Sequence, residues 1–354
     1  MKALILSGGK GTRLRPITHT SAKQLVPVAN KPILFYTIEA VVAAGVREVG
    51  IIVGDTHQEI RNACGDGSKW GCSITYIQQD APLGLAHAVK IAESFIKDES
   101  FVMYLGDNLI RSGVVEFAQR FNADKPNAQI LLAHVPNPTE FGVAELEGNR
   151  VVRLVEKPKE PKTDLALVGV YMFDKTIFEA VNNIEPSWRG ELEITDAIQY
   201  LVDTGRVVNS HIITGWWKDT GKREDMLEAN RLMLEDLQTR IEGLVDQDSV
   251  IHGRVEIGDG SEIIRSHIRG PVIVGKNCKI TDAYIGPFTS IADGSVVRKS
   301  EVEHSIVLED CCIEELDARM EDSLLGRNVR VCKVDSKPRA YRFMLGESSD
   351  VSVL

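Results

Sequence analysis

The chain has 354 residues, of which 43% are hydrophobic, and this is more apolar sequence than a single compact core usually contains. Its formal net charge of −10 argues against general nucleic-acid binding, which depends on lysine and arginine. No apolar run approaches the roughly 20 residues that cross a bilayer, and residues 1–7 are too short for a signal-peptide core. We therefore expect two domains and no contact with a membrane.

The six cysteines indicate where the protein resides. They form no Cys-x-x-Cys pair, which argues against a zinc site or a thioredoxin-like redox site. Free thiols are typical of reducing compartments, so we expect a cytoplasmic location.

Charge is distributed unevenly along the chain. Residues 1–38 contain no acidic residue, and the first carboxylate belongs to Glu39. A locally cationic segment in an acidic protein indicates a site for a small, highly charged anion. The basic residues of this segment are Lys2, Lys10, Arg13, Arg15, Lys23 and Lys31.

Short apolar runs alternate with helical patterns through the first half of the chain. This alternation predicts an α/β fold, with a doubly wound, mostly parallel sheet of Rossmann-like type and helices on both faces. Ligands of such sheets bind at the carboxyl ends of the strands, and segments 7–15 and 106–108 begin there. The expected strands are 3–6, 49–53, 73–77 and 101–105, and the expected helices are 32–44 and 85–96.

Three glycines, Gly8, Gly9 and Gly11, stand within four positions directly after the first expected strand. Glycines let backbone amides approach phosphate oxygens closely and turn toward them, so this loop is expected to bind phosphate groups. Neither the Walker pattern nor the dinucleotide pattern matches the loop. A tight structural turn is the alternative interpretation.

A period of 17 residues appears after about residue 240. The aliphatic columns are Ile257, Val274, Ile291, Leu308 and Leu325; then Ile263, Ile280 and Val297; then Ile268, Ile285 and Val302. Four positions after the first column stand Ser261, Cys278, Ser295, Cys312 and Val329. Each unit therefore predicts one three-sided coil of a parallel β-helix, and the pattern resembles the left-handed hexapeptide-repeat β-helix. An ordinary β-sandwich with accidental spacing is the alternative.

Two N-terminal motifs resemble those of a known enzyme family. Gly-Gly-x-Gly-Thr-Arg-Leu-x-Pro covers 8–16, and Lys-Gln-Leu-x-Pro-Val-x-x-Lys-Pro covers 23–32. Both are similar to the sugar-1-phosphate nucleotidylyltransferases, which make nucleotide sugars, and most similar to the longer thymidylyl-transferring form that ends in a left-handed β-helix. The resemblance implies a nucleotidyltransferase catalytic domain at 1–240 and a hexapeptide-repeat β-helix domain at 241–354.

The resemblance also implies roles for charged residues. Arg13 is expected to hold the triphosphate and the departing pyrophosphate, and Lys23 to bridge the α-phosphate and the incoming sugar phosphate. Asp107, in Leu-Gly-Asp-Asn at 105–108, and Asp219, in Trp-Lys-Asp-Thr-Gly at 217–221, are expected to hold one Mg²⁺. A turn or a helix cap is the alternative for either aspartate.

Substrate contacts follow from further matching motifs. The resemblance implies nucleotide contacts at Gly8, Gly9, Gly11, Thr12, Gln24, Gln79 and Gly84, and sugar-phosphate contacts at Gly142, Glu156, Lys157 and Val168. Segment 156–158 could instead be a solvated strand end, and segment 189–193 could simply start a helix. Glutamine amides both donate and accept, which suits the edge of thymine or uracil. Because these bases differ by one methyl group, worth about 1–3 kcal/mol, UTP is expected as a poorer substrate than dTTP.

The expected reaction joins dTTP and glucose 1-phosphate to give dTDP-glucose and pyrophosphate with Mg²⁺. The sugar phosphate is already an anion, so the enzyme must supply charge neutralisation and in-line placement. One alternative is a bifunctional nucleotidyl and acetyl transferase acting on an amino-hexose 1-phosphate, with His252, His267 or His304 as the base. Another is a non-catalytic regulatory subunit, although Arg13, Lys23, Asp107 and Asp219 are all present. The β-helix is expected to serve assembly into a homo-oligomer.

Overall fold

The computed structural model describes residues 1–9, 11–335, 337 and 340–353, and its contacts divide the chain into two compact units. The sheet unit comprises the described residues within 1–10, 21–25 and 33–219. The β-helix unit comprises those within 11–20, 26–32 and 220–354. Two short segments near the amino terminus therefore belong to the β-helix unit, while Lys10 of the cationic segment lies outside the described residues.

The sheet unit contains a nine-stranded sheet with the order β5-β4-β1-β6-β11-β8-β12-β10-β9. The four predicted strands are confirmed as a parallel block: β1 (Lys2–Ser7), β4 (Glu48–Val53), β5 (Ser73–Gln78) and β6 (Phe101–Leu105). β11 (Leu165–Phe173) runs antiparallel to both of its main neighbours, β6 and β8 (Ala128–His134). The remaining strands are β12 (Val208–Ile212), parallel to β8, and the antiparallel pair β9 (Gly142–Glu147) and β10 (Arg150–Glu156).

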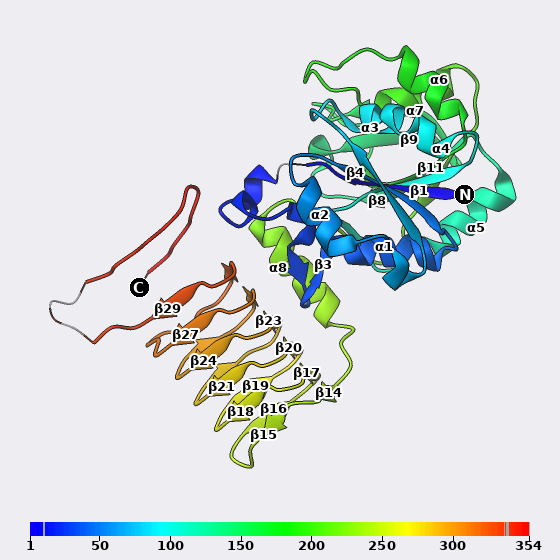
Figure 1. The fold of residues 1–354 in the computed structure, drawn as a ribbon. Coiled ribbons are helices and arrows are strands. Elements are labelled where there is room, and N and C mark those ends of the chain that lie inside the picture. Colours follow the sequence, from blue (N-terminus) through cyan, green and yellow to red (C-terminus); the bar gives the residue numbers. More distant parts are fainter. Residues whose placement is uncertain (10, 336, 338–339, 354) are drawn as a thin grey trace. The chain divides into compact units, whose positions relative to one another are not determined.

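Helices cover both faces of this sheet, as the doubly wound prediction requires (Figure 1). Strand side chains alternate between the faces, so Leu4 and Leu6 join one apolar core while Ala3 and Ile5 join the other. The predicted helix 85–96 is interrupted at Ala92. One face carries α1 (Ile33–Ala43), α2 (His57–Cys64) and α5 (Val115–Asp124); the other carries α3 (Leu85–Ile91), α4 (Glu93–Ile96), α6 (Thr176–Asn183) and α7 (Ile194–Asp203).

Short elements fill the connections. Two paired strands, β7 (Asn108–Ile110) and β13 (Trp217–Asp219), form a separate antiparallel ladder in the sheet unit. The 3₁₀ helices are η1 (Thr12–Leu14), η2 (Ile17–His19), η3 (Lys23–Leu25), η4 (Ser68–Trp70) and η5 (Pro138–Glu140). The β-helix unit also contains the hairpin of β2 (Pro27–Val28) and β3 (Lys31–Pro32), and helix α8 (Arg223–Leu234).

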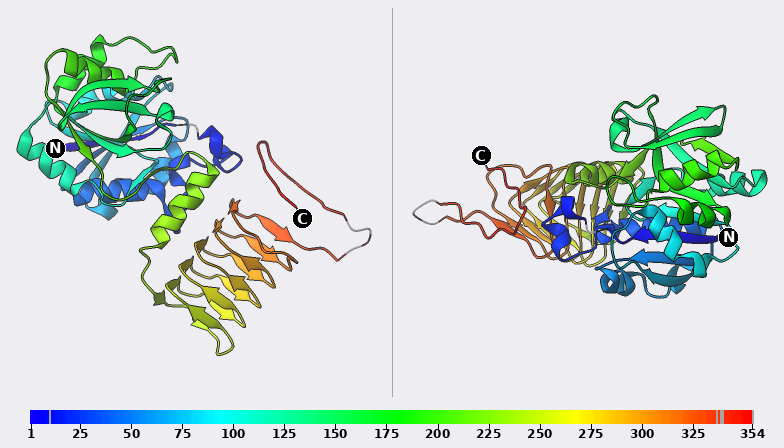
Figure 2. Two further views of the ribbon diagram at one scale, coloured as in Figure 1. Left: turned by 180° about the vertical axis from the view of Figure 1, so that it is seen from behind. Right: turned by 90° about the horizontal axis from the view of Figure 1, so that it is seen from above.

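Three parallel sheets form the sides of the β-helix, and its successive coils stack on one another, as the repeat predicts (Figures 1 and 2). The first contains β14 (Arg240–Ile241), β17 (Val255–Ile257), β20 (Val272–Val274), β23 (Thr289–Ile291), β26 (Ile306–Val307) and β28 (Leu324–Leu325). The second contains β15 (Leu244–Val245), β18 (Glu262–Ile264), β21 (Lys279–Thr281), β24 (Val296–Arg298), β27 (Cys312–Glu314) and β29 (Arg330–Cys332). The third contains β16 (Val250–His252), β19 (His267–Arg269), β22 (Tyr284–Ile285) and β25 (Glu301–Val302).

The coils depart from the strict period in one place. Ile257, Val274 and Ile291 stack as predicted, but Ile291 pairs with Val307 and Val307 with Leu325. The prediction for Leu308 is therefore wrong, because one coil is a residue shorter than the period and the next is a residue longer.

The same shift corrects the column of small residues. The amide of Cys311 donates to Ser295 Oγ (3.2 Å), in the way that the amide of Cys278 donates to Ser261 Oγ (2.9 Å). Cys311 therefore occupies the position predicted for Cys312, since the short coil advances the residues that follow it by one place until the longer coil restores the register.

Candidate functional site

The ladder between β7 and β13 brings two distant aspartates together. Asp107 immediately precedes β7, and Asp219 pairs with Asn108 in the antiparallel register. Lys23, at the start of η3, places its Nζ 2.6 Å from Asp107 Oδ2 and 3.8 Å from Asp219 Oδ1. Three predicted residues thus form one group, which we call the Lys23 cluster: Lys23, Asp107 and Asp219.

Neighbouring side chains hold the cluster in place. Asn108 Nδ2 donates to Asp107 Oδ1 (2.9 Å), and Asn108 Oδ1 accepts from Trp217 Nε1 (2.6 Å). Gly169 packs against this pair with a φ of 72°, and a Cβ there would lie 3.0 Å from Asn108 Oδ1. Sequence reasoning did not single out Asn108 or Trp217 as individual residues, although both stand inside quoted motifs.

The carboxylate of Asp107 is ionised at neutral pH. Burial raises the pKa of Asp107, but the Lys23 ammonium and the hydrogen bonds from Lys23 and Asn108 bring that pKa below its usual value. The ionised carboxylate of Asp107 suits a cation, and the Lys23 ammonium can also face a phosphate.

The donor set of the cluster suits Mg²⁺, which prefers oxygen ligands. In the part of the chain that the structure describes, no three His, Cys, Asp or Glu residues gather closely enough to hold a metal ion by themselves, and the Lys23 cluster offers two carboxylates. Asp107 and Asp219 would thus supply two ligands, and phosphate oxygens and water would supply the others. This is the usual arrangement for Mg²⁺ at phosphate sites.

The glycine loop lies beside two predicted glutamines. A Cβ on Gly8 would lie 3.2 Å from Gln79 Oε1, and one on Gly9 would lie 3.8 Å from Gln24 Nε2. Gln24 is 3% exposed, and its buried Oε1 accepts no hydrogen bond from any described residue. Because buried acceptors are normally satisfied, this oxygen is suited to a donor on a ligand.

His87 orients Gln79, a role that the sequence did not reveal. Gln79 Nε2 lies 3.1 Å from His87 Nδ1 and 3.4 Å from Gly84 O. Burial, followed by the charge of Lys90, lowers the pKa of His87, so the ring is neutral at neutral pH. Because Gln79 Nε2 is a donor, the contact is a hydrogen bond when the ring proton lies on Nε2 and Nδ1 accepts. With both acceptors facing the amide nitrogen, Gln79 Oε1 points toward the glycine loop.

Gly84 requires the absence of a side chain. Its φ is 106°, and a Cβ would approach Leu192 O to 2.3 Å. Backbone hydrogen bonds from Ala86 N to Leu192 O (3.0 Å) and from Leu192 N to Leu83 O (2.8 Å) join this turn to the segment before α7. The predicted nucleotide segment and segment 189–193 therefore pack together.

Glu156 lies in a half-buried polar group at the end of β10. Thr195 Oγ1 donates to Glu156 Oε2 (3.2 Å), and Arg189 Nη1 lies 3.6 Å from Glu156 and 3.3 Å from Glu193. Burial, and then the Glu193 charge, raise the pKa of Glu156. Segment 189–193 does precede a helix, since α7 begins at Ile194, but its side chains also pair with the predicted sugar-binding glutamate.

Of the other predicted sugar-phosphate residues, Gly142 and Lys157 lie beside Glu156. A Cβ on Gly142 would lie 2.6 Å from Thr195 Cγ2 and 3.2 Å from Glu156 Oε2. Lys157 has a positive φ of 42°, and its amide donates to Phe141 O (3.1 Å). Val168 is buried where the pairing of β11 with β8 shifts, between Leu167 and Tyr171.

Arg13, Gly11 and Thr12 belong to the β-helix unit and not to the unit that contains Lys23. The Arg13 guanidinium lies against Gly221, where a Cβ would be 3.0 Å from Nη2. Gly11 precedes η1 with a φ of 62°. The guanidinium would have to shift by a few tenths of an ångström to admit a side chain at this position.

Other predictions concern the β-helix and the whole chain. His252 and His267 are exposed, while His304 Nδ1 lies 2.5 Å from Asp322 Oδ1. All six cysteines are free. Among the described residues, no helix combines the length and the apolar character needed to cross a membrane.

Comparisons with known proteins place these features in context. The profile of the nucleotidyl transferase family matches residues 2–236. The chain is 57% identical to the glucose-1-phosphate thymidylyltransferase of Streptomyces antibioticus and 54% identical to that of Streptomyces griseus; each alignment covers 100% of this chain and 99% of the relative. A solved structure from Bacillus anthracis, described as a glucose-1-phosphate thymidylyltransferase in complex with sucrose, is similar at a TM-score of 0.63 and 34% identity, covering 68% of this chain and 97% of that chain.

Proposed function

The chain belongs to the nucleotidyl transferase family, and from this premise we propose that it is a glucose-1-phosphate thymidylyltransferase. A phosphate oxygen of glucose 1-phosphate attacks the α-phosphorus of dTTP. The bond from that phosphorus to the bridging oxygen of the β-phosphate breaks, giving dTDP-glucose and pyrophosphate. The observation that supports this reaction best is the Lys23 cluster, which holds a buried ammonium against two carboxylates in a chain that matches these relatives over its full length.

In this proposal Lys23 supplies the charge that lets two phosphate-bearing reactants approach one another. Both substrates are anions, and their repulsion is strong in a poorly solvated site. The ammonium of Lys23 exchanges a contact with Asp107 for contacts with the α-phosphate and the sugar phosphate. Its stabilisation of the transition state requires a fixed position, which the buried, hydrogen-bonded surroundings provide.

Asp107 and Asp219 are proposed to hold Mg²⁺. When bound there, the ion would neutralise charge on the triphosphate and orient it for in-line displacement. The lowered pKa of Asp107 keeps this ligand ionised over the neutral range. Asn108 fixes the direction of that carboxylate through its 2.9 Å hydrogen bond.

Base and sugar recognition are proposed for the predicted nucleotide-binding and sugar-phosphate-binding residues. Gln24 and Gln79 would read a pyrimidine edge, with Gly8, Gly9 and Gly84 keeping the approach open. The orphan acceptor on Gln24 and the orientation of Gln79 by His87 support this assignment. Glu156, Lys157, Gly142 and Val168 would contact the sugar phosphate, and the exposed Lys157 is the cation of that group.

Several further proposals rest on the motifs alone. Arg13, with Gly11 and Thr12, is proposed to bind the triphosphate. Three other statements remain proposals: the functional division at residues 1–240 and 241–354, a cytoplasmic location and assembly into a homo-oligomer. The free thiols support the cytoplasmic location.

Pyrophosphate release with a panel of nucleoside triphosphates and sugar 1-phosphates tests the proposal. We expect the highest kcat/KM with dTTP and glucose 1-phosphate, and a lower value with UTP. The reaction should require Mg²⁺. Absence of product with every pair would refute a nucleotidyltransferase activity, and preference for UTP with an amino-hexose phosphate would refute the thymidylyl assignment. Consumption of acetyl-CoA with an amino-hexose 1-phosphate would instead favour the bifunctional alternative.

A further inference from the structure

A buried asparagine joins three segments of the β-helix unit. Asn230, on α8, is fully buried, and its Oδ1 accepts hydrogen bonds from Ala29 N (2.8 Å) and Ser290 Oγ (2.5 Å). Its Nδ2 donates to Phe288 O (3.0 Å). One side chain therefore ties the turn of the β2–β3 hairpin to the coil that contains β23. Both polar ends of the amide are satisfied, so the junction is specific in its geometry.

A second contact reinforces the same junction. Asn30, which follows Ala29 in the hairpin turn, donates from Nδ2 to Ile291 O (2.7 Å). Both turn residues have positive φ, 46° for Ala29 and 57° for Asn30. Such values are costly for alanine, so the turn depends on partners outside the hairpin. The hydrogen bond from Ala29 N to Asn230 and that of Asn30 to Ile291 are those partners.

The hairpin that is held in this way continues the segment that contains Lys23. Residues 23–32 form one motif, in which Lys23 to Leu25 make η3 and Val26 leads directly into β2. Val26 and Val28 are both buried, which restricts the path of the chain between the lysine and the turn. A displacement of about 1 Å in a catalytic group can reduce turnover about 100-fold.

We propose that Asn230 is a positioning residue for nucleotidyl transfer, through which the β-helix coil at 288–291 fixes the hairpin and so the placement of Lys23. This inference rests on the proposed function. It gives the β-helix a part in the reaction that is separate from assembly. The role is indirect, since Asn230 contacts the hairpin and the coil and acts through the chain that follows Lys23.

Three variants and a matched control test this role. Asn230→Ala removes all three hydrogen bonds, Ser290→Ala removes one of them, and Asn30→Ala removes the second contact. Ser295→Ala is the control, because Ser295 is equally buried in the same β-helix, donates to Leu308 O (3.0 Å) and accepts from Cys311 N, but contacts neither Asn230 nor the hairpin. Each full-length protein is assayed for pyrophosphate release at 25 °C, with the folded fraction measured by circular dichroism.

Positioning predicts a change in kcat per folded molecule, whereas a purely structural role predicts only a lower melting temperature. We expect kcat to fall about tenfold or more in Asn230→Ala and about threefold in Ser290→Ala and in Asn30→Ala, with KM for dTTP within about threefold of wild type. Ser295→Ala should lose thermal stability and keep kcat within about twofold.

Two results would overturn the inference. One is a kcat within twofold of wild type in every folded variant of the junction; the other is a loss in Ser295→Ala equal to that in Ser290→Ala. If Asn230→Ala does not fold, Ser290→Ala and Asn30→Ala decide the question alone. An inactive wild-type protein would instead refute the proposed function, so the two failures are distinguishable.

Discussion

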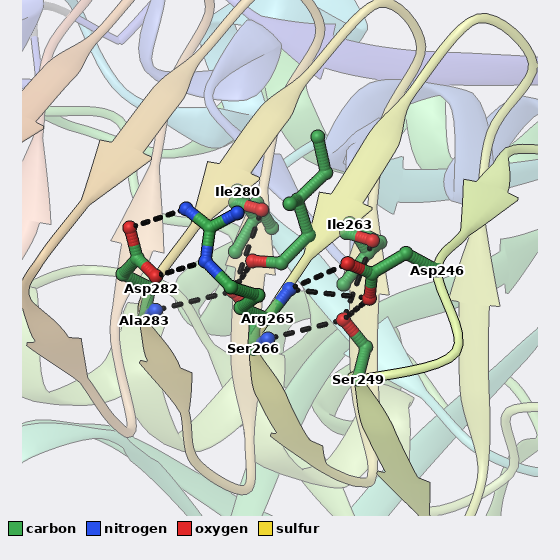
Figure 3. Close-up of polar contacts among 9 residues, drawn as sticks. Asp246, Ser249, Ile263, Arg265, Ser266, Ile280, Asp282 and Ala283 are labelled. Carbon is green, nitrogen blue, oxygen red and sulfur yellow. Dashed lines mark hydrogen bonds and ion pairs between the residues drawn. The ribbon is translucent and has the colours of Figure 1, made fainter.

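Charged side chains form different patterns in the two units. In the β-helix they pair one coil apart: Arg265 Nε and Nη2 donate to Asp282 at 2.7 and 2.8 Å, and the Arg265 amide donates to Asp246 (Figure 3). Ser249 and Ser266 continue this ladder of contacts between successive coils. In the sheet unit, Lys23 instead contacts Asp107 and Asp219, which are distant in sequence both from Lys23 and from one another.

This difference indicates what each kind of contact contributes to stability and to activity. The β-helix pairs repeat a local relation and lie at the surface, where water screens them. In the Lys23 cluster the ammonium is buried and the two carboxylates are partly exposed. This cluster does not repeat, and it concentrates charge where a phosphate substrate is proposed to bind. Breaking the Lys23 cluster should therefore lower activity strongly, whereas breaking a surface pair of the β-helix should change activity and stability little.

Removal of Lys23 should have the largest effect. Lys23→Ala is expected to lower kcat by about 10²- to 10³-fold and to change the affinity for dTTP much less, because the ammonium stabilises charge chiefly in the transition state. Steady-state kinetics of pyrophosphate release and equilibrium binding of dTTP measure the two quantities. An equal loss in both would mean that the lysine only anchors the ground-state triphosphate.

Lys2 offers a matched control for that variant. Its side chain is 7% exposed, as is that of Lys23, and its ammonium lies 3.3 Å from Glu99 and 3.7 Å from Glu48. Lys2 begins β1, whereas the glycine loop follows the other end of that strand. Lys2→Ala should thus reduce stability and leave kcat per folded molecule unchanged.

Asp219 should affect the metal requirement more than the maximal rate. Asp219→Asn keeps the size of the side chain and removes one negative oxygen ligand, so the Mg²⁺ concentration for half-maximal activity should rise about tenfold. A titration of pyrophosphate release against MgCl₂ measures this shift. Asp164→Asn, which changes an exposed carboxylate paired with His134, is the control. Unchanged activity at limiting Mg²⁺ would remove Asp219 from the proposed metal site.

The sequence predicted the regular coils and strands better than the one place where the coil length departs from 17 residues. Short apolar runs and the 17-residue period are local, so the four parallel strands and the three β-helix sheets could be predicted from them. Leu308 was misplaced because a one-residue deletion followed by a one-residue insertion leaves the overall period intact at Leu325. The pairing of Val307 depends on the packing of its coil and has no signal in the spacing.

Within the candidate site, motifs indicated which residues are candidates for binding or catalysis but not which of them contact one another. Asp107 and Asp219 were paired only through a resemblance, since the β7–β13 register that joins them is a tertiary feature. His87 had no identifiable partner in the sequence, because its contact with Gln79 depends on the path of the turn through Gly84. Such contacts depend on how the chain folds between motifs.

The contact between His87 and Gln79 predicts a pH effect on dTTP binding. The pKa of His87 is lowered from 6.5, so the ring is neutral at pH 7.5 and protonates as the pH falls below that value. A protonated Nδ1 donates and no longer accepts, so Gln79 loses a partner and KM for dTTP should rise severalfold between pH 7.5 and 5.5.

A variant separates this effect from the titration of dTTP itself. His87→Gln places an amide oxygen near the same position, and that oxygen accepts at every pH in the range. The ratio of KM values for wild type and variant cancels the ionisation of the substrate. A ratio that does not change with pH would rule out His87 as the titrating group.

The smallest effect is expected at the exposed pairs of the β-helix. Arg265→Ala breaks both hydrogen bonds to Asp282, but Arg265 is 53% exposed and its partner 34%, so solvent replaces the interaction at little cost. The melting temperature should change by no more than about 2 °C, and kcat should be unchanged. Ile280→Ala in the same coils is the comparison, because Ile280 is fully buried and its loss should cost about 2–5 kcal/mol. A drop in melting temperature for Arg265→Ala as large as that for Ile280→Ala would show that the charge ladder, and not the aliphatic columns alone, holds the coils together.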